Sequence, residues 1–192
     1  QEPVRRQTVV HHDAVSIVAL REGQDSSRDD GAAEILMVRQ YRHPVRAMLW
    51  EVPAGLLDVP GEAPLAAARR ELAEETDLRA ASWHALTDYF SSPGATSEAG
   101  RVYLARDLSE LPRQERTERT EEEAEMTYRW VPLQDAVQLV LDGKVHNALA
   151  IQAILATYAA SARGFEGLRE AAGGWEFHPY MGHRRQKPQT FR

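Results

Sequence analysis

The strongest constraint on the fold is a glycine-bearing loop that runs directly into an acidic helix. Pro64 suits the first turn of a helix, because its missing N–H would have no partner there and its φ is already helical. From residue 64 to residue 76 the chain consists mostly of Ala, Leu, Arg and Glu, which are strong helix formers. Leu65, Ala68 and Leu72 recur at three- and four-residue steps, so this helix presents a narrow apolar stripe to a core.

The same helix carries three carboxylates on one face, because Glu71, Glu74 and Glu75 stand at positions i, i+3 and i+4. Like charges at this spacing cost roughly 0.2–0.5 kcal/mol per pair on an exposed helix. A hard divalent cation such as Mg²⁺ or Mn²⁺ reverses that sign, since it takes carboxylate oxygens as ligands. Taken alone, the pattern is more often a solvated acidic face with Arg69 and Arg70 as neighbours.

The residues around these glutamates favour the metal site. The stretch resembles the Nudix box, G-x5-E-x7-R-E-U-x-E-E-x-G-U with U aliphatic, the signature of hydrolases that act on a nucleoside diphosphate linked to another group. The match runs from Glu62 through the helix to Leu78. It differs at two positions: six residues instead of five separate Gly55 from Glu62, and Asp77 replaces the last glycine. Aspartate tolerates the left-handed cap conformation better than most residues, so we expect the carboxylate geometry to be kept.

Composition places the chain among ordinary globular proteins. Its 192 residues, 43% hydrophobic and 27% charged, suffice for one domain with a substantial core. The net charge of −6 argues against a general binder of nucleic acid or membrane surfaces. Because the chain has no cysteine, disulfides, thiolate zinc sites and a cysteine nucleophile are excluded. No apolar run approaches the roughly 18–20 residues of a membrane span. No leader pattern is visible, so we expect a cytoplasmic protein.

Apolar runs on either side of the acidic helix predict strands. They cover residues 15–20, 35–38 and 49–52 before the helix and residues 83–90, 101–105 and 126–131 after it. Two more helices are predicted over residues 132–141 and 147–162. This order predicts an α/β fold with helices packed on a mixed sheet, and the resemblance implies the Nudix α/β/α sandwich. We expect a Nudix hydrolase domain over residues 1–162, shortened at its N-terminal part, and a loosely structured tail over residues 163–192.

Within the Nudix group the chain looks most like the ADP-ribose pyrophosphatases. The similarity covers residues 9–160 and rests on four segments: 40–42 (QYR), 49–55 (LWEVPAG), 92–98 (SPGATSE) and the acidic run 121–125. It implies metal-dependent hydrolysis of ADP-ribose to AMP and ribose 5-phosphate, with Mg²⁺ or Mn²⁺ as cofactor, by a homodimer. Two alternatives remain. The substrate is another nucleoside-diphosphate sugar or a dinucleotide, or the chain is a Nudix-fold binding protein without turnover, which three intact repelling carboxylates argue against.

The resemblance also assigns roles to individual residues. Metal contacts fall on the Ala54 carbonyl and on the carboxylates of Glu71 and Glu75. Glu74 supports them, and Arg70 orients a carboxylate of the helix because a fixed guanidinium can hold it in one rotamer.

Four further residues match substrate-binding positions: Arg42, Glu51, Leu57 and Glu98. The guanidinium of Arg42 suits phosphate oxygens, which it can bind in a fork. Without the resemblance, Arg42 is a surface charge at a strand end and Glu98 caps a loop. Glu123 is the best match to the glutamate that handles the attacking water, with Glu122 second, although a solvated acidic loop is the simpler interpretation of that run.

Two features receive simpler predictions. His11 and His12 are adjacent on a predicted strand and therefore point to opposite faces, which does not suit a shared metal. The segment from Glu110 to Glu125 is rich in charge and poor in apolar residues, so we expect nothing in it to anchor to the core.

Overall fold

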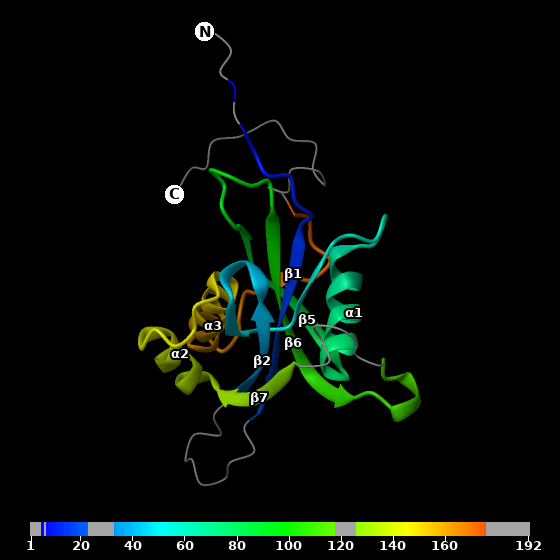
Figure 1. Cartoon of the computed structure of the whole chain (residues 1–192). Helices are drawn as coiled ribbons and strands as arrows, with labels where there is room; N and C mark the ends of the chain where they lie inside the picture. Colours follow the sequence, from blue (N-terminus) through cyan, green and yellow to red (C-terminus); the bar gives the residue numbers. More distant parts are fainter. Residues whose placement is uncertain (1–4, 6, 23–32, 118–125, 176–192) are drawn as a thin grey trace.

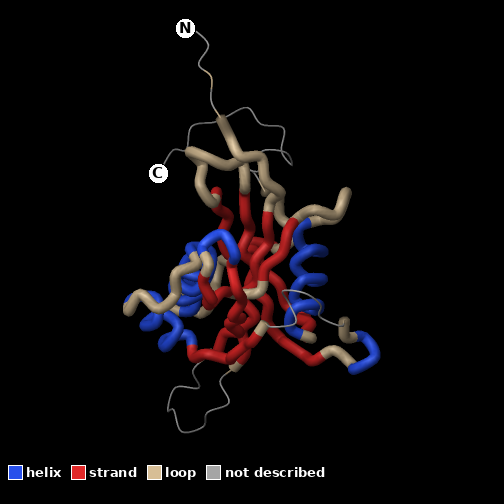
Figure 2. Tube along the Cα trace, in the orientation of Figure 1, coloured by secondary structure: helices blue, strands red, loops and turns tan. Residues whose placement is uncertain are grey.

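The structure, a computed structural model, describes residue 5 and residues 7–22, 33–117 and 126–175. A central mixed sheet is flanked by helices on both faces (Figures 1 and 2). No helix in these ranges is long and apolar enough to cross a membrane. The elements are β1 (Ala14–Arg21), β2 (Glu34–Arg42), η1 (His43–Val45), β3 (Ala47–Glu51), β4 (Ala54–Leu56), α1 (Pro64–Thr76), β5 (Leu78–Phe90), β6 (Ala99–Glu110), η2 (Arg113–Glu115), β7 (Thr127–Pro132), α2 (Leu133–Leu141), α3 (Ala148–Ser161) and β8 (Arg169–Glu170).

Strand β1 lies in the middle of the sheet. The strand order is β3-β2-β1-β6-β5-β8, and in addition β4 pairs with β1 and β7 pairs with β2. β1 runs parallel to β6, from Ala14 opposite Gly100 to Ala19 opposite Ala105, and antiparallel to β2 and β4. All of its residues from Ala14 to Leu20 are buried, as expected for a mostly apolar strand that is covered on both faces.

The helices form the outer layers of an α/β/α sandwich. Ile17 of β1 packs in the same core cluster as Leu72 of α1, whereas its neighbour Val18 packs in the cluster that contains Ile154 of α3. Adjacent residues of one strand enter different clusters because strand side chains alternate between the two faces of a sheet. Helix α1 therefore covers one face, and α2 and α3 cover the other, which confirms the predicted fold class.

Helix α1 begins at Pro64 and ends at Thr76, as the sequence predicts. Asp77 caps it with φ 57° and ψ 26°, and its N–H donates a hydrogen bond of 3.0 Å to the Ala73 carbonyl. Aspartate therefore takes the left-handed conformation in which glycine is more usual. Ala68 and Leu72 of the predicted apolar stripe are buried.

Strands β5 and β6 are longer than predicted. β5 already starts at Leu78, and the two strands pair antiparallel from Leu78 opposite Glu110 to Phe90 opposite Ala99. The added residues, such as Arg79 opposite Ser109, lack a strand-like apolar pattern. Their extended conformation is stabilised by backbone hydrogen bonds to the partner strand, a long-range effect that local preference does not report.

Residues 163–175, which the sequence places in the tail, are attached to the sheet. Arg169 of β8 pairs with Ala85 of β5. The buried guanidinium of Arg101 donates hydrogen bonds to the carbonyls of Gly173, at 2.8 Å, and Gly174, at 3.2 Å. It also lies 5.0 Å from the ring centre of Trp175, which is buried. The prediction of a loosely structured tail is thus corrected for residues 163–175, while residues 176–192 lie outside the described ranges.

The first part of the segment before β7 is also anchored. Leu111 is buried, and its N–H donates a hydrogen bond of 2.7 Å to the Asp77 carbonyl. Arg116 donates to the Leu111 carbonyl at 3.0 Å and pairs with Glu110 at 3.0 Å. The expectation that nothing in this segment reaches the core is wrong for residues 110–117. Residues 118–125 are outside the part of the chain that the structure describes.

Candidate active site

Glu71 and Glu75 reach from α1 to the backbone of β4. A Cβ atom on Gly55 would lie 1.9 Å from Cδ of Glu71, so the missing side chain makes room for that carboxyl group. The backbone N–H of Ala54 donates a hydrogen bond of 3.1 Å to Oε2 of Glu75, which is buried. Two successive residues of β4 therefore seat two carboxylates, and the three predicted metal-contact residues lie together.

Arg70 binds three carboxylates at once. Its Nε and Nη2 donate to Glu62 at 3.1 and 3.0 Å, and its Nη1 donates to Glu71 at 2.7 Å and to Glu74 at 3.1 Å. The hydrogen bond with Glu62 is the largest cause of the raised pKa of Arg70 and of the lowered pKa of Glu62. One guanidinium therefore offsets the repulsion along the acidic face and holds these side chains together.

The loop between β4 and α1 accommodates its additional residue in a turn. The N–H of Glu62 donates to the Val59 carbonyl at 3.1 Å, and Gly61 has φ 80°. Proline at the second position and glycine with positive φ at the third are typical of a type II turn, which residues 59–62 form with Pro60 and Gly61. This turn brings Glu62 back to Arg70, so the longer loop preserves the carboxylate network.

A cavity of about 810 Å³ lies beside Gly55. It is lined by the segment before β1, the ends of β2 and β3, β4, the β5–β6 connection and the N-terminus of α3. Eight of its lining residues are polar: His11, Arg42, Glu51, Tyr89, Ser91, Glu98, Asn147 and Gln152. Its larger apolar lining residues come from η1, β3, β4, β5 and α3: Pro44, Val45, Leu49, Leu56, Phe90 and Leu149.

Arg42 and Glu51 form a two-bond ion pair in this wall. Arg42 donates from Nε to Oε1 of Glu51 at 2.9 Å and from Nη2 to Oε2 at 2.7 Å, and Gln40 lies 3.4 Å from the same oxygen. Glu51 is only 1% exposed, and a buried carboxylate requires such a partner. The sequence predicts that the fork of Arg42 faces phosphate oxygens. In the structure the fork holds Glu51, which fixes the plane of the guanidinium at the cavity.

The remaining predicted site residues divide into three cases. Glu98 lines the cavity, with Oε1 3.9 Å from Nδ1 of His11. Leu57 is not among the described residues that line it and instead packs against the core cluster beneath α1, whereas its neighbour Leu56 lines the cavity. Glu123, with the alternative Glu122, lies outside the described residues.

His11 and Tyr89 line the cavity although no motif in the sequence marks them. The prediction that His11 and His12 share a strand is wrong, because residues 10–13 precede β1. Instead, Val9 pairs with Thr96, and the N–H of His11 lies 3.4 Å from Oγ of Ser97. These contacts join segments that are distant in the sequence, so local pattern cannot reveal them.

The donor set suits a hard divalent cation. Within residues 7–22, 33–117 and 126–175, no group of three Asp, Glu or His side chains is arranged to hold a metal ion. Arg70 and the Ala54 N–H donate hydrogen bonds to the helix carboxylates instead. Carboxylate and backbone carbonyl oxygens are nevertheless the ligands that Mg²⁺ and Mn²⁺ take. Glu71, seated against Gly55 in the cavity wall, and Glu75, one helical turn further, are the residues that could hold such a cation.

Fold and site together define an α/β/α-sandwich protein whose acidic helix and glycine loop adjoin a polar cavity. The sequence profile of the NUDIX domain matches residues 10–153. The chain therefore belongs to the Nudix family.

Named relatives agree with this family. An ADP-ribose pyrophosphatase of Mycobacterium tuberculosis is 43% identical over 176 residues, which cover 92% of this chain and 79% of that protein. An ADP-ribose pyrophosphatase of Bacillus subtilis is 37% identical over 150 residues, or 78% of this chain and 74% of that protein. A solved structure described as an ADP compounds hydrolase superposes with a TM-score of 0.64 at 24% identity, covering 83% of this chain and 77% of that one, and so shares the fold.

Proposed function

We propose that the chain is a metal-dependent hydrolase that cleaves the diphosphate bond of ADP-ribose to give AMP and ribose 5-phosphate. The observation that carries this proposal is the seating of Glu71 and Glu75 on β4, next to a cavity of about 810 Å³. Such a carboxylate pair can hold a divalent cation, and the cation can neutralise the negative charge of a diphosphate. A diphosphate is therefore a substrate that suits this site. The two relatives at 43% and 37% identity, both named ADP-ribose pyrophosphatase, favour ADP-ribose as that diphosphate.

The proposed roles follow from the contacts. Ala54, Glu71 and Glu75 would hold Mg²⁺ or Mn²⁺, with Glu74 in support. The bound cation supplies charge neutralisation of the diphosphate oxygens. Arg70 keeps the helix carboxylates in place through its bonds to Glu62, Glu71 and Glu74. Arg42, held by Glu51, presents positive charge at the cavity wall, where the substrate phosphates would lie.

Glu123 is proposed to position or deprotonate the attacking water. A general base contributes roughly 10²–10⁴-fold to kcat, so Glu123→Gln is expected to lower kcat by that factor while substrate still binds. Glu121→Gln serves as the control from the same acidic run and is expected to change little. A large loss in Glu122→Gln instead would move the role by one residue.

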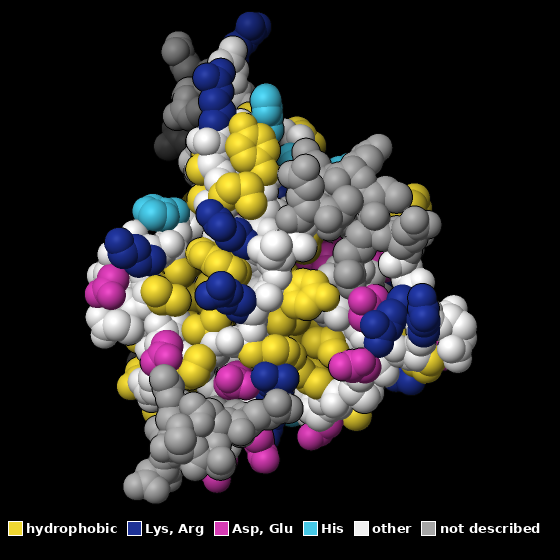
Figure 3. Space-filling model, turned by 60° about the horizontal axis from the view of Figure 1, so that its bottom comes forward, with side chains coloured by type: hydrophobic (Ala, Val, Ile, Leu, Met, Phe, Trp, Pro, Cys, Tyr) yellow, Lys and Arg dark blue, Asp and Glu magenta, His cyan; other side chains and the backbone are white. Residues whose placement is uncertain are grey.

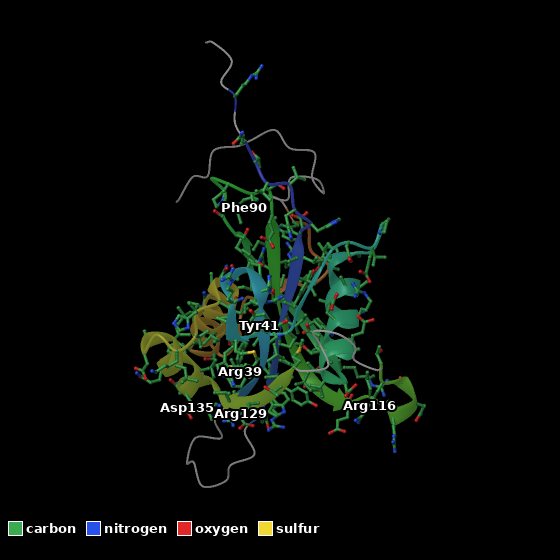
Figure 4. All side chains as sticks on the ribbon, in the orientation of Figure 1. Arg39, Tyr41, Phe90, Arg116, Arg129 and Asp135 are labelled. Carbon is green, nitrogen blue, oxygen red and sulfur yellow. The ribbon has the colours of Figure 1, made fainter. Side chains whose placement is uncertain are left out.

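A homodimer is proposed as the functional form. Figure 3 shows hydrophobic side chains gathered into a patch with charged ones around it. A second hollow of about 530 Å³ lies between β2, β3, β7 and α2, lined partly by Met37 and Trp50. Arg39, labelled in Figure 4, lies 5.8 Å from the Trp50 ring. Aromatic side chains, Met and Arg are enriched in protein interfaces. Light scattering that gives a monomer mass at every concentration would contradict the dimer.

The cytoplasmic location of the protein stays a prediction.

A release assay tests the proposed reaction. The chain is incubated with ADP-ribose, another ADP-sugar, a dinucleotide and a nucleoside triphosphate, in Mg²⁺ and in Mn²⁺, and AMP is quantified. We expect the highest kcat/KM for ADP-ribose, and loss of turnover in Glu71→Gln but not in Glu115→Gln, a matched control on η2. A higher kcat/KM for the triphosphate would refute the substrate class. Binding without any turnover would favour the alternative of a Nudix-fold binding protein.

A further inference from the structure

Tyr89 places a phenol in the cavity at a position fixed by the sheet. It lies on β5 opposite Gly100 of β6. A Cβ atom on Gly100 would lie 1.9 Å from Cζ and 2.1 Å from the hydroxyl oxygen of Tyr89, so the ring occupies the space that this glycine leaves. The pairing of the two strands therefore sets where the phenol stands, and the residue lines the cavity.

The phenol is a neutral hydrogen-bond donor. Burial raises the pKa of Tyr89 to about 12, and the nearby Glu98 carboxylate adds to the increase. The hydroxyl of Ser16, a fully buried residue, is its polar neighbour. Within the described part of the chain, the Ser16 hydroxyl makes no hydrogen bond of full geometry. The phenol therefore keeps its proton and its capacity to donate to a molecule in the cavity.

Other polar groups gather at the same end. The N–H of Ser91 donates to the Glu98 carbonyl at 3.3 Å, and His11 lies 3.9 Å from the Glu98 carboxylate. This end thus offers acceptors and donors close together. The elements η1, β3 and α3 contribute four apolar side chains, beside the polar Glu51 and Gln152: Pro44, Val45, Leu49 and Leu149. Sugar hydroxyls both donate and accept, so they fit the polar end, while a nucleobase gains more from apolar contact.

We propose that Tyr89, together with Glu98, recognises the terminal sugar of a nucleoside-diphosphate sugar, which makes Tyr89 a specificity-determining residue. The proposal rests on the proposed function and adds the residue that selects the second half of the substrate. The phenol donates a hydrogen bond to one sugar hydroxyl, and the Glu98 carboxylate accepts one from another. Phe90, labelled in Figure 4 at the end of β5, offers the rival arrangement in which this end stacks against the base.

Tyr89→Phe tests the hydroxyl while keeping the ring. Its kcat/KM is measured for ADP-ribose and for an ADP ester in which a methyl group replaces the terminal sugar. Loss of one neutral hydrogen bond should lower kcat/KM for ADP-ribose roughly 3- to 10-fold and leave the methyl ester unchanged. Tyr103→Phe is the matched control, because Tyr103 is also a buried tyrosine but packs in the core cluster beneath α1. It should leave the ratio of the two substrates as in the wild type.

Calorimetry with the products separates this inference from the reaction itself. In Tyr89→Phe the Kd of ribose 5-phosphate should rise by the same factor, and that of AMP should not change. A weaker AMP complex with unchanged ribose 5-phosphate binding would overturn the proposal and support the arrangement with the base at Phe90. Equal losses on both substrates would also overturn it. Failure of the wild type to hydrolyse ADP-ribose would refute the proposed function, whereas an unchanged ribose 5-phosphate Kd in Tyr89→Phe refutes only the role of Tyr89.

Discussion

Gly55→Ala is the substitution whose effects on activity and on stability should differ most. The new Cβ atom would lie 1.9 Å from Cδ, 2.0 Å from Oε1 and 2.4 Å from Cγ of Glu71. A tight contact begins below 3.4 Å, so the carboxyl carbon of Glu71 has to move by about 1.5 Å. The group that moves is the end of a flexible side chain, so the backbone of β4 can stay in place.

The cost in stability is therefore small. Moving Glu71 breaks its 2.7 Å hydrogen bond from Arg70. A charged hydrogen bond contributes roughly 1.5–3 kcal/mol, and partial exposure of Arg70 places this one at the lower end. The lower entropy of the unfolded alanine chain returns roughly 0.4–1 kcal/mol. The net loss of about 1 kcal/mol corresponds to a Tm decrease of roughly 2–4 °C for a chain of this size.

The cost in activity is large, because a misplacement of about 1 Å in a catalytic group costs roughly 10²-fold. We expect kcat/KM for ADP-ribose to fall by about 10²-fold or more, with a higher Mg²⁺ requirement. Thermal unfolding and initial rates over a Mg²⁺ titration measure both quantities. Gly174→Ala is the control, because a Cβ atom there meets nothing within 4 Å. Activity within threefold of the wild type in Gly55→Ala would refute the placement of Glu71 at the metal.

Three further predictions follow from individual contacts. Glu75→Gln should nearly abolish turnover at saturating Mg²⁺ with the fold intact by circular dichroism, since the amide oxygen can still accept from β4; normal turnover would exclude Glu75 as a ligand. Arg42→Ala should lower the free energy of unfolding by about 2–3 kcal/mol, below the usual cost of a broken buried pair because Arg42 is 39% exposed; an unchanged urea midpoint would show that Glu51 needs no partner. Burial acts to raise the pKa of Asp88, but hydrogen bonds from Arg101 and a second arginine outweigh it and lower this pKa below the ordinary 3.8. Ionised Asp88 therefore adds to the free energy of unfolding above pH 3.8, and this contribution is lost as the pH falls below that value. Asp88→Asn should flatten the acid limb of a curve of unfolding free energy against pH.

The acidic helix was predictable because its determinants are local. Pro64 at the start, helix-forming residues in the middle and Asp77 at the cap all act within one or two turns, and the bounds of α1 match the prediction. The alignment of Glu71 and Glu75 follows from helical periodicity alone. The Nudix-box glycine was also visible in the sequence, although only the structure shows that Gly55 makes room for Glu71.

The sequence by itself therefore determined the helix, its carboxylates and the family, because short-range spacing specifies all three. Only the tertiary structure decided which side chains line the cavity. The fork of Arg42 holds Glu51, and Tyr89 enters the cavity because β5 pairs with β6 in the register that sets it opposite Gly100. Strand register and cavity walls arise from contacts between residues far apart in the chain, and these depend on the packing of the whole sheet rather than on any local pattern.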